Sequence, residues 1–401
     1  MFPAASLLTI LLLALSIAAS PVEIRDSPIT LPIARRLNVS GGTINLLEYD
    51  KARVAALKDD RHIGSIAVTN EVTGYIAAVG VGSPATTYNL IVDTGSSNTW
   101  VGADTAYVKT STSVNTGQPV DVGYGSGSFS GTEYTDTVTL GSGLTITKQS
   151  IGDASTTEGF SGVDGILGIG PVGLTEGTLT NSPTVTIPTV TDNLYSEGTI
   201  PQKVVGIFFG PTTSQTITNG ELSFGGTDAA KYTGDIGYTS ITTTNPASTY
   251  WGINESITYG STTILSSTAG IVDTGTTFLY VATDAYNKYK SETGATVDGA
   301  TGLLLVSSTQ YSALKNLNFN IGSNTLSLTP NAQIWPRSLN TKIGGSSKAI
   351  YLIVADIGTP SGSGFDFVNG YTFLERFYSV FDTTNSRVGF AKTSYTDATT
   401  N

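Results

Sequence analysis

The tripeptide Asp-Thr-Gly occurs twice in this 401-residue chain, at residues 93–95 and 273–275. Each copy follows a short apolar run that ends in Ile-Val, and each precedes two hydroxyl residues. Two carboxyl groups held close together share one proton, because like charges a few ångströms apart cannot both stay ionised. Such a pair can activate water as a base and protonate a leaving nitrogen as an acid. The repeat therefore predicts an amide hydrolase with Asp93 and Asp273 in one site.

The residues that flank each predicted carboxyl are glycines and hydroxyl residues. The glycine N–H groups and the second hydroxyls can donate hydrogen bonds to the carboxylates, and the threonines inside the tripeptides can tie the two loops together. These supporting residues are Thr94, Gly95, Ser96, Thr274, Gly275 and Thr276. Asp-x-Gly is also common in ordinary turns, where the Asp only caps the loop. Two copies after matching strands favour the functional interpretation.

The composition removes most other hydrolytic chemistry. The chain has no cysteine, and its single histidine, His62, precedes both tripeptides. Nucleophiles activated by histidine and zinc sites built from His or Cys are therefore excluded, and we expect neither a metal nor a cofactor. The net charge is −11, and the excess acid lies in the body of the chain, which argues against a nucleic-acid partner.

The N-terminus predicts export. Residues 7–19 form an almost unbroken apolar run that is too short to span a bilayer and ends in small residues, as in a secretory signal peptide. We assign residues 1–20 to this signal, and no later segment is apolar enough for a membrane anchor. We expect a secreted protein; delivery to an acidic vacuole is the alternative.

Residues 45–61 form one charge-dense segment with the composition of a helix, ahead of a body rich in strand and turn residues. We interpret residues 21–63 as a propeptide, with a surface helix of the main domain as the alternative. In the body, we expect only short helical patches, such as residues 283–292 and 373–378. A weaker repeat, at residues 164–170 and 367–370, predicts that a glycine-bearing strand crosses behind each Asp-Thr-Gly loop.

From residue 74 to residue 392 the chain resembles the pepsin-like aspartic proteases, and GSPATTYNLIVDTGSSNTW is similar to the fungal, polyporopepsin-type branch. The resemblance implies an all-β, bilobal pepsin-like fold, with two homologous β-rich lobes, residues 64–238 and 239–401, and a cleft between them. It also implies an aspartic endopeptidase that acts on protein and peptide substrates at acidic pH, with Asp93 and Asp273 as its catalytic dyad. We expect a monomer, because both halves of the site are in one chain.

The resemblance assigns further residues to substrate binding. Residues 122–131 (VGYGSGSFSG) are similar to the family's flap, a hairpin that closes over substrate, with Trp100 beside its tyrosine. Three apolar residues match or lie near positions that line the main side-chain pocket, although plain core packing explains them nearly as well. The residues expected to meet substrate are Ile91, Gly95, Tyr124, Gly125, Ser126, Phe160, Ile166, Gly275 and Thr276. The chain departs from the family where Asn369-Gly370-Tyr371 replaces the usual Leu-Gly-Asp.

The propeptide interpretation implies an intramolecular inhibitor. Basic residues upstream of the body, with Lys51 or Lys58 as candidates, would pair with the dyad at neutral pH and release it when acid protonates the carboxylates. Two sequons, at Asn38 and Asn254, predict glycosylation of a secreted chain, the first being lost with the propeptide. The competing function is a catalytically silent homologue that binds peptides in the same cleft.

Overall fold

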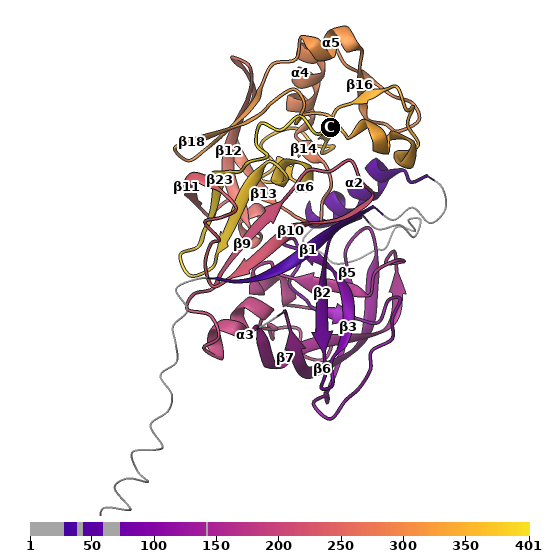
Figure 1. The fold of residues 1–401 in the computed structure, drawn as a ribbon, viewed down its shortest axis with the longest axis vertical. Helices are drawn as coiled ribbons and strands as arrows, with labels where there is room; N and C mark the ends of the chain where they lie inside the picture. The colour runs from indigo at the N-terminus through magenta and orange to yellow at the C-terminus, as the bar shows by residue number, and fades with distance from the viewer. Residues whose placement is uncertain (1–27, 38–42, 59–72, 142) are drawn as a thin grey trace, which may run out of the picture.

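The computed structural model describes residues 28–37, 43–58, 73–141 and 143–401. The predicted signal peptide, the Asn38 sequon and the predicted propeptide boundary lie outside these residues. The chain folds into two strand-rich halves, one below and one above in Figure 1, with helix α2 (Leu46–Lys58) between them at one side. The all-β prediction is confirmed, because strands dominate both halves and the helices are short.

In the described residues the strands form sheets of thirteen, seven and three members. The thirteen-stranded sheet contains, in chain order, β1 (Ile29–Leu37), β2 (Thr73–Val81), β3 (Thr86–Asp93), β4 (Trp100–Val101), β5 (Val114–Gly123), β6 (Ser128–Thr139), β7 (Thr145–Glu158), β8 (Gly165–Gly168), β9 (Val204–Phe209), β10 (Thr216–Phe224), β11 (Thr233–Ser240), β22 (Phe377–Asp382) and β23 (Arg387–Lys392). The seven-stranded sheet contains β12 (Gly252–Tyr259), β13 (Thr262–Val272), β14 (Leu279–Val281), β17 (Leu317–Ile321), β18 (Asn324–Leu328), β20 (Val354–Asp356) and β21 (Phe367–Asn369). The small sheet contains β15 (Thr296–Val297), β16 (Leu304–Val306) and β19 (Ile350–Tyr351).

The helices other than α2 are short and lie outside the sheets. They are α3 (Val190–Ser196), α4 (Thr283–Thr293), α5 (Ser308–Ser312) and α6 (Tyr371–Leu374), with 3-10 turns at η1 (Val172–Thr175), η2 (Ala247–Thr249) and η3 (Arg337–Ile343). The expected patch at 283–292 is confirmed by α4. The patch expected at 373–378 is wrong, because the helix ends at Leu374 and the buried, aromatic run from Phe377 joins the sheet as β22.

Each Asp-Thr-Gly loop is backed by a parallel strand, as the weaker repeat predicts. Strand β8 pairs with β3 so that Gly168 lies opposite Asp93, and β21 pairs with β13 so that Asn369 lies opposite Val272. A Cβ on Gly168 would lie 2.6 Å from the carbonyl oxygen of Asn98, and one on Gly370 would lie 2.7 Å from that of Thr276. Glycine is therefore required where the two chains cross.

Strand β1 was not predicted from the sequence. It is antiparallel to β10 on one side and to β2 on the other, within the sheet that joins the two halves. Its inward residues alternate, Leu31, Ile33, Arg35 and Leu37 being buried. Arg35 places a charge within the alternation, and Pro32 lies in the middle of the run. Both features argue against a central strand, so the period-2 pattern is easy to miss.

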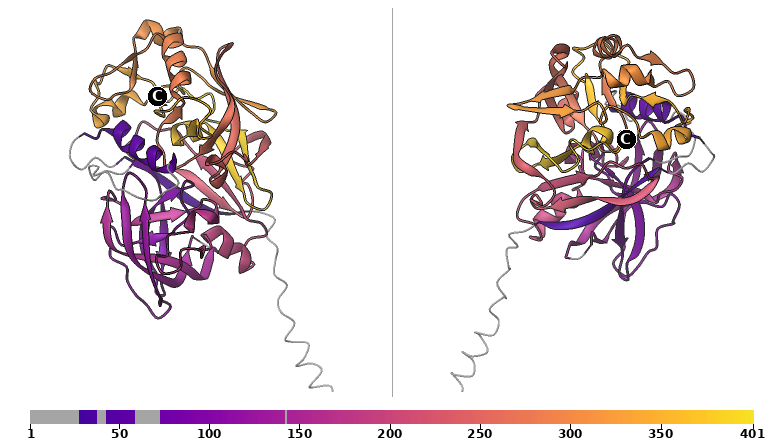
Figure 2. Two further views of the ribbon diagram at one scale, coloured as in Figure 1. Left: turned by 180° about the vertical axis from the view of Figure 1, so that it is seen from behind. Right: turned by 45° about the horizontal axis from the view of Figure 1, so that its top comes forward.

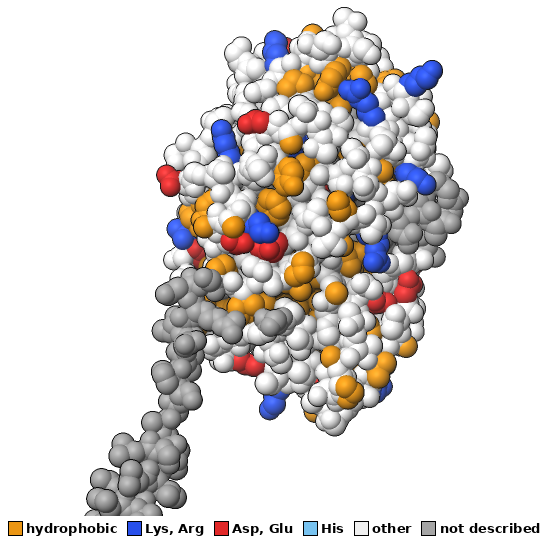
Figure 3. Space-filling view, viewed as in Figure 1, with side chains coloured by type: hydrophobic (Ala, Val, Ile, Leu, Met, Phe, Trp, Pro, Cys, Tyr) orange, Lys and Arg blue, Asp and Glu red, His pale blue; other side chains and the backbone are white. Residues whose placement is uncertain are grey.

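Views from behind and from a tilted angle confirm that α2 lies between the two halves and that β1 crosses beneath it (Figure 2). On the face shown in Figure 3, charged side chains are few and scattered among uncharged ones, in keeping with a chain that is 13% charged. None of the helices within the described residues is long and apolar enough to span a membrane.

Arg35 of β1 makes a buried ion pair with the opposite end of the chain. Its Nη1 lies 3.3 Å from Oε1 of Glu375, and both side chains are almost fully buried. Tyr75 donates a hydrogen bond to the same oxygen, and the guanidinium lies over the ring of Tyr371. Burial raises the pKa of Glu375, although Arg35 opposes this shift. A buried pair of this kind stabilises only while both members are present.

We predict that Arg35→Met destabilises the protein at pH 7 by about 3–5 kcal/mol, because the Glu375 charge is then buried without its partner. The measurement is the free energy of unfolding in denaturant. Arg36→Met is the matched control, since Arg36 is only half-buried and its side chain donates a hydrogen bond to the carbonyl of Gly162 instead of pairing with a buried acid. Equal losses in the two variants would contradict the prediction.

Candidate active site

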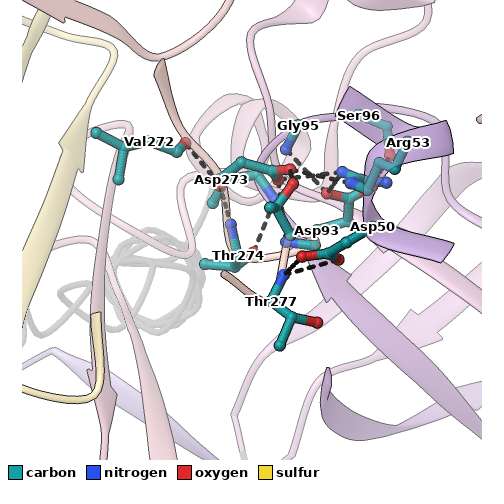
Figure 4. Close-up of polar contacts among 12 residues, drawn as sticks. Asp50, Arg53, Asp93, Gly95, Ser96, Val272, Asp273, Thr274 and Thr277 are labelled. Carbon is teal, nitrogen blue, oxygen red and sulfur yellow. Dashed lines mark hydrogen bonds and ion pairs between the residues drawn. The ribbon is translucent and has the colours of Figure 1, made fainter. Parts of the chain in front are cut away.

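Asp93 and Asp273 lie together at the junction of the two halves, at the ends of β3 and β13 (Figure 4). Both side chains are fully buried. One guanidinium nitrogen of Arg53, Nη2, lies 2.6 Å from Oδ1 of Asp93 and 3.0 Å from Oδ1 of Asp273. The two predicted carboxyls therefore face a single point.

Each carboxylate is held by the glycine and the hydroxyl residue that follow it. The Gly95 N–H donates to Oδ1 of Asp93 at 2.9 Å, and the Ser96 hydroxyl donates to Oδ2 at 2.6 Å. In the second loop, Gly275 N–H and the Thr276 hydroxyl donate to Asp273 at 3.0 and 2.5 Å. These four bonds orient the carboxyls and favour their ionised forms.

The threonines inside the tripeptides tie the two loops together through a reciprocal set of hydrogen bonds. The backbone N–H of Thr94 donates to Oγ1 of Thr274, and the N–H of Thr274 donates to Oγ1 of Thr94, both at 2.9 Å. Each hydroxyl then donates across to a backbone carbonyl, of Val272 or Val92. All these groups are buried, so each bond replaces a costly unsatisfied polar group.

Arg53 of α2 occupies the position where a reacting group would meet both carboxyls. Besides the contacts of Nη2, its Nε donates to Oδ2 of Asp273 at 2.9 Å, which makes that pair bidentate. The prediction that Lys51 or Lys58 pairs with the carboxyls is wrong. Lys51 is exposed and pairs with Glu48, while Lys58 donates to Thr359 and to the carbonyl of Ile357.

The reason lies in helix geometry and in the shape of the guanidinium. Residues two apart on a helix point in nearly opposite directions, so Lys51 cannot share the inward direction of Arg53. The planar fork of arginine also matches two carboxylates, which the single ammonium of lysine does not.

The two carboxyls have different pKa shifts. Burial raises the pKa of Asp93, and the nearby Asp273 adds to this, against the opposing effect of Arg53. For Asp273, burial acts in the same direction, but the charge and hydrogen bond of Arg53, together with the bonds from Thr276 and Gly275, lower its pKa overall. Asp273 is therefore the stronger acid of the two while Arg53 is bound.

Asp50, one helical turn before Arg53, anchors α2 to the second loop. Its carboxylate accepts hydrogen bonds from the backbone N–H groups of Thr277, at 2.9 and 3.0 Å, and of Phe278, at 2.8 Å. Burial raises the pKa of Asp50 to about 7, although these bonds oppose the shift. Asp50 and Arg53 together fix α2 across the two carboxyls.

The predicted flap is a hairpin of β5 and β6, closed by a hydrogen bond from the N–H of Tyr124 to the carbonyl of Gly127 at 2.7 Å. Its tip packs on α2. Gly125 has a φ of 73°, and a Cβ there would lie 2.5 Å from Cβ of Ala56. Ser126, also at the tip, is buried. The hairpin therefore covers the helix in the position where it is expected to cover substrate.

The apolar residues expected to line the main pocket lie under this hairpin. Ile91, Phe160 and Ile166 belong to one buried cluster with Tyr124 and Trp100. The Tyr124 ring stacks toward Trp100 at 6.5 Å between centroids and meets Phe160 edge-on at 5.5 Å. The cluster is close-packed, and it faces the flap.

Asn369-Gly370-Tyr371 stands where the family usually has Leu-Gly-Asp, and two of these residues make buried contacts. Asn369 donates through Nδ2 to the buried carboxyl of Glu255 at 2.9 Å. Tyr371 lies under the guanidinium of Arg35 at 5.2 Å from its ring centroid. The aromatic ring thus faces the cation where the family usually has an acid.

A pocket remains beside Arg53 after α2 has filled the rest of the space. Its lining includes Arg53, Leu57, Gly95, Tyr124, Leu174 and Tyr250. It lies between the flap and the first Asp-Thr-Gly loop, so the helix covers the carboxyls without filling the whole groove.

Arg53 and Asp50 were not singled out from the sequence, although a signal exists. The apolar residues Leu46 and Leu57, with Asp50 and Arg53 between them, lie at helical spacing on one buried face. Two opposite charges on an otherwise apolar face indicate partners elsewhere in the fold, because charges are not buried unpaired.

Comparison with known proteins agrees with this geometry. The model of the eukaryotic aspartyl protease family matches residues 74–393. Polyporopepsin of Irpex lacteus is 65% identical over 339 residues, which are 84% of this chain and 99% of the relative. Gastricsin of Cavia porcellus is 32% identical over 337 residues, 79% of each chain.

A solved structure has the same fold. The crystal structure of the aspartic proteinase from Irpex lacteus superimposes with a TM-score of 0.82 and 59% sequence identity, over 94% of this chain and all of that one. The bilobal, pepsin-like fold class expected from the sequence is confirmed.

We predict that Thr274→Val destabilises the protein by about 2–4 kcal/mol, because it removes the Thr274 hydroxyl that bonds the buried carbonyl of Val92 and N–H of Thr94. Denaturant unfolding at neutral pH measures the loss. Thr87→Val, at an exposed position of β3, is the control and should change stability by less than about 0.5 kcal/mol. A Thr274 variant as stable as the control would show that the loops are held by other contacts.

Proposed function

Because the chain belongs to the eukaryotic aspartyl protease family and is an aspartic endopeptidase, we propose that it is made as a secreted zymogen whose α2 blocks its own catalytic dyad. The observation that carries the proposal is the buried contact of Arg53 with both Asp93 and Asp273. The matched family region begins at residue 74, after both β1 and α2. This supports the assignment of residues 21–63 to a propeptide, after a signal at 1–20 and before lobes at 64–238 and 239–401.

The proposed mechanism uses the dyad as an acid–base pair. Once Arg53 has left, a water molecule lies between the two carboxyls, which hold one proton between them. The ionised carboxyl removes a proton from the water as its oxygen bonds to the substrate carbonyl carbon, and the protonated carboxyl donates to the carbonyl oxygen. The C–N bond breaks as the nitrogen takes a proton from one carboxyl and a hydroxyl of the tetrahedral intermediate gives a proton to the other, which leaves a free acid, a free amine and a pair that again holds one proton.

The supporting residues have separate roles in this proposal. Thr94, Ser96, Thr274 and Thr276 hold the carboxyls in place, while the flap residues Tyr124, Gly125 and Ser126 close over the substrate backbone, with Trp100 behind the tyrosine. The cluster of Ile91, Phe160 and Ile166 would favour a bulky apolar residue beside the cleaved bond. Gly95 and Gly275 leave room for the substrate, since a Cβ at either would lie 2.6 Å from a dyad oxygen.

The proposal also covers the substrates, the inhibitor, the oligomeric state, glycosylation and the destination of the protein. Substrates are unfolded proteins and peptides, the propeptide is the intramolecular inhibitor, and the enzyme acts as a monomer. The exposed Asn254 is proposed as a glycan site, although its side-chain oxygen accepts a hydrogen bond from Thr242. Export to the medium, as opposed to an acidic vacuole, is the proposed destination.

The pH dependence follows from the two dyad shifts. The pKa of Asp273 is lowered while α2 is docked on the dyad. Its carboxylate therefore stabilises docking at pH values above its ordinary pKa of 3.8, and this stabilisation is lost as the pH falls through the lowered pKa. Asp93, whose pKa is raised, takes up its proton first, and that proton does not favour release.

We therefore predict that the purified precursor stays latent near neutral pH and loses roughly its first 60 residues in acid, as the pH falls through the lowered pKa of Asp273. Intact mass and cleavage of an unfolded protein are followed together over pH 7 to 2.5. Asp273→Asn is the control, which should neither process itself nor cleave. Processing without activity in either protein would contradict the proposed function.

Arg53→Met should speed self-processing, because α2 then covers the dyad without providing a cation for it. We expect self-processing at pH 5 to be at least about tenfold faster than in the unaltered precursor, since removing one partner of a buried pair costs several kcal/mol. Lys51→Met, on the same helix but exposed, should process at the unaltered rate. If both variants behave alike, with unchanged unfolding midpoints, Arg53 is not the inhibitory contact.

A further inference from the structure

A carboxyl and an amide meet in the interior of the sheet that holds the second dyad residue. Glu255 belongs to β12 and Asn369 to β21, and these two strands lie on either side of β13, which ends one residue before Asp273. Figure 1 shows β12 and β13 side by side in the upper half. Nδ2 of Asn369 donates to Oε2 of Glu255 at 2.9 Å, and both residues are buried. The pair therefore joins the two neighbours of the strand that carries Asp273.

The backbone around Asn369 supports the dyad loop. Its carbonyl accepts the N–H of Asp273 at 3.1 Å, and the N–H of Tyr371 donates to the carbonyl of Thr276 at 2.8 Å. Between these bonds, Gly370 crosses so close to the loop that a Cβ would lie 2.7 Å from the carbonyl oxygen of Thr276. A displacement of Asn369 would therefore also displace Asp273.

Two oxygens of the pair have no protein donor among the described residues. They are Oε1 of Glu255 and Oδ1 of Asn369, and both atoms are buried. A carboxylate oxygen and an amide oxygen are both acceptors, so neither can satisfy the other while Glu255 is ionised. A proton on Oε1 would make this oxygen a donor for Oδ1. The two groups would then exchange two hydrogen bonds, as in a dimer of a carboxylic acid and an amide.

Within the described part of the chain, no cation pairs with Glu255. The strands β12, β13, β17 and β21 contain no Lys or Arg. Helix α4 packs on β13, but neither of its two lysines, Lys288 and Lys290, is buried. Burial raises the pKa of Glu255 to about 8, and the hydrogen bond from Asn369 opposes this shift. The surroundings thus favour the neutral form of the acid.

Other titratable side chains on the elements around the pair do not change this balance. Phenols are neutral at the pH at which a glutamate ordinarily ionises, and further carboxylates would only add negative charge. The buried titratable residues on β12, β14, α4 and α6 and at the ends of β13 and β21 are Tyr259, Tyr280, Tyr289, Tyr371, Asp273 and Asp366. None of these groups offsets a charge on Glu255.

We propose that Glu255 is protonated in the active enzyme and that its neutral pair with Asn369 positions the strand that carries Asp273. An ionised Glu255 would be a buried charge without a cation, which is costly, and it would leave two acceptor oxygens without donors. The proposal does not depend on the role of α2, because both residues lie within the region that the family model matches. Glu255 touches neither the dyad nor the substrate, so it is a positioning residue.

The pair makes the support of Asp273 sensitive to pH. In the unfolded chain Glu255 has its ordinary pKa of 4.5, whereas in the folded protein its pKa is about 8. Its contribution to stability is therefore complete below pH 4.5 and is lost as the pH rises through about 8. The second Asp-Thr-Gly loop is less firmly held as the solution becomes alkaline.

Infrared spectroscopy of the full-length protein reads the protonation state directly. A protonated carboxyl has a C=O stretching band that is distinct from the bands of carboxylates and of the backbone. We expect Glu255→Gln to remove such a band at about pH 6.5, where an ordinary glutamate is ionised. In the unaltered protein this band should fade as the pH rises through about 8. Glu292→Gln, at an exposed position of α4, is the control and should leave the band in place.

Kinetics test whether the pair positions the dyad. The amide of Glu255→Gln can donate to Oδ1 of Asn369 and accept from its Nδ2, so kcat at about pH 4 should stay within about twofold of the unaltered enzyme. At about pH 8 the same variant should lose activity at least about tenfold more slowly, because it has no proton to lose. Glu292→Gln should lose activity at the unaltered rate.

Asn369→Leu tests the other half of the pair. This change leaves Glu255 buried without its donor, and we expect kcat to fall at least about tenfold with a smaller change in KM, because it displaces Asp273 and not the substrate-binding surface. The double variant Glu255→Leu/Asn369→Leu replaces the polar pair by an apolar contact and should recover part of the loss. If Asn369→Leu alone does not fold, a double variant that folds gives the same answer.

Three results would overturn the proposal. A spectrum that Glu255→Gln leaves unchanged would show that Glu255 is ionised. Equal rates of alkaline inactivation in Glu255→Gln and the unaltered enzyme would show that no proton on this residue matters for stability. A Glu255→Gln enzyme as impaired in kcat as Asn369→Leu would show that the pair does not act as a neutral one. A failure of self-processing would bear on the proposed zymogen and leave the spectrum unaffected.

Discussion

The contact between one guanidinium and two buried carboxyls is the interaction on which the rest of the structure depends. Two carboxylates facing one point repel each other, and burial makes that repulsion costly. Arg53 offsets it with hydrogen bonds to both. The same residue would have to leave before a water molecule could take its place. In the proposed zymogen, stability and latency are therefore consequences of the same contact.

Three buried charged side chains within residues 28–58 anchor this segment, and they lie in different parts of the fold. Arg35 pairs with Glu375 beneath the sheet that joins the halves, Asp50 binds backbone N–H groups of the second loop, and Arg53 binds the dyad. All three are buried, so removing a partner, or protonating the carboxylate in the contact, removes the stabilisation that the contact provides. β1 and α2 also bury apolar side chains, among them Leu31, Ile33, Leu46, Leu47, Val54 and Leu57, and a change in charge does not weaken those contacts. The charged anchors are the contacts of the segment that a change in charge can weaken. Under the proposed function, a change in charge at these anchors releases the segment.

The sequence predicted those parts of the site in which local chemistry repeats. The two Asp-Thr-Gly loops, the glycine crossings behind them and the hairpin around Tyr124 all have local signatures, and the structure contains each of them. Helix α2 was also predictable from its composition. What the helix touches was not, because a contact between Arg53 and Asp273 spans 220 residues and depends on how the halves close. Strand β1 was missed because its inward Arg35 breaks the apolar alternation, and only its distant partner Glu375 explains why an arginine is tolerated there.

In the proposed zymogen, α2 excludes substrate from the dyad until the propeptide leaves. The most direct measurement is calorimetric titration of the precursor and the processed enzyme, both at pH 6, with a peptide analogue that carries a hydroxyl group in place of the scissile carbonyl. Such analogues bind through the dyad itself, and they bind far more tightly than substrates do. The account predicts that the precursor binds at least about 100-fold more weakly than the processed enzyme, because Arg53 and α2 must first be displaced. Equal affinity for the two forms would contradict it.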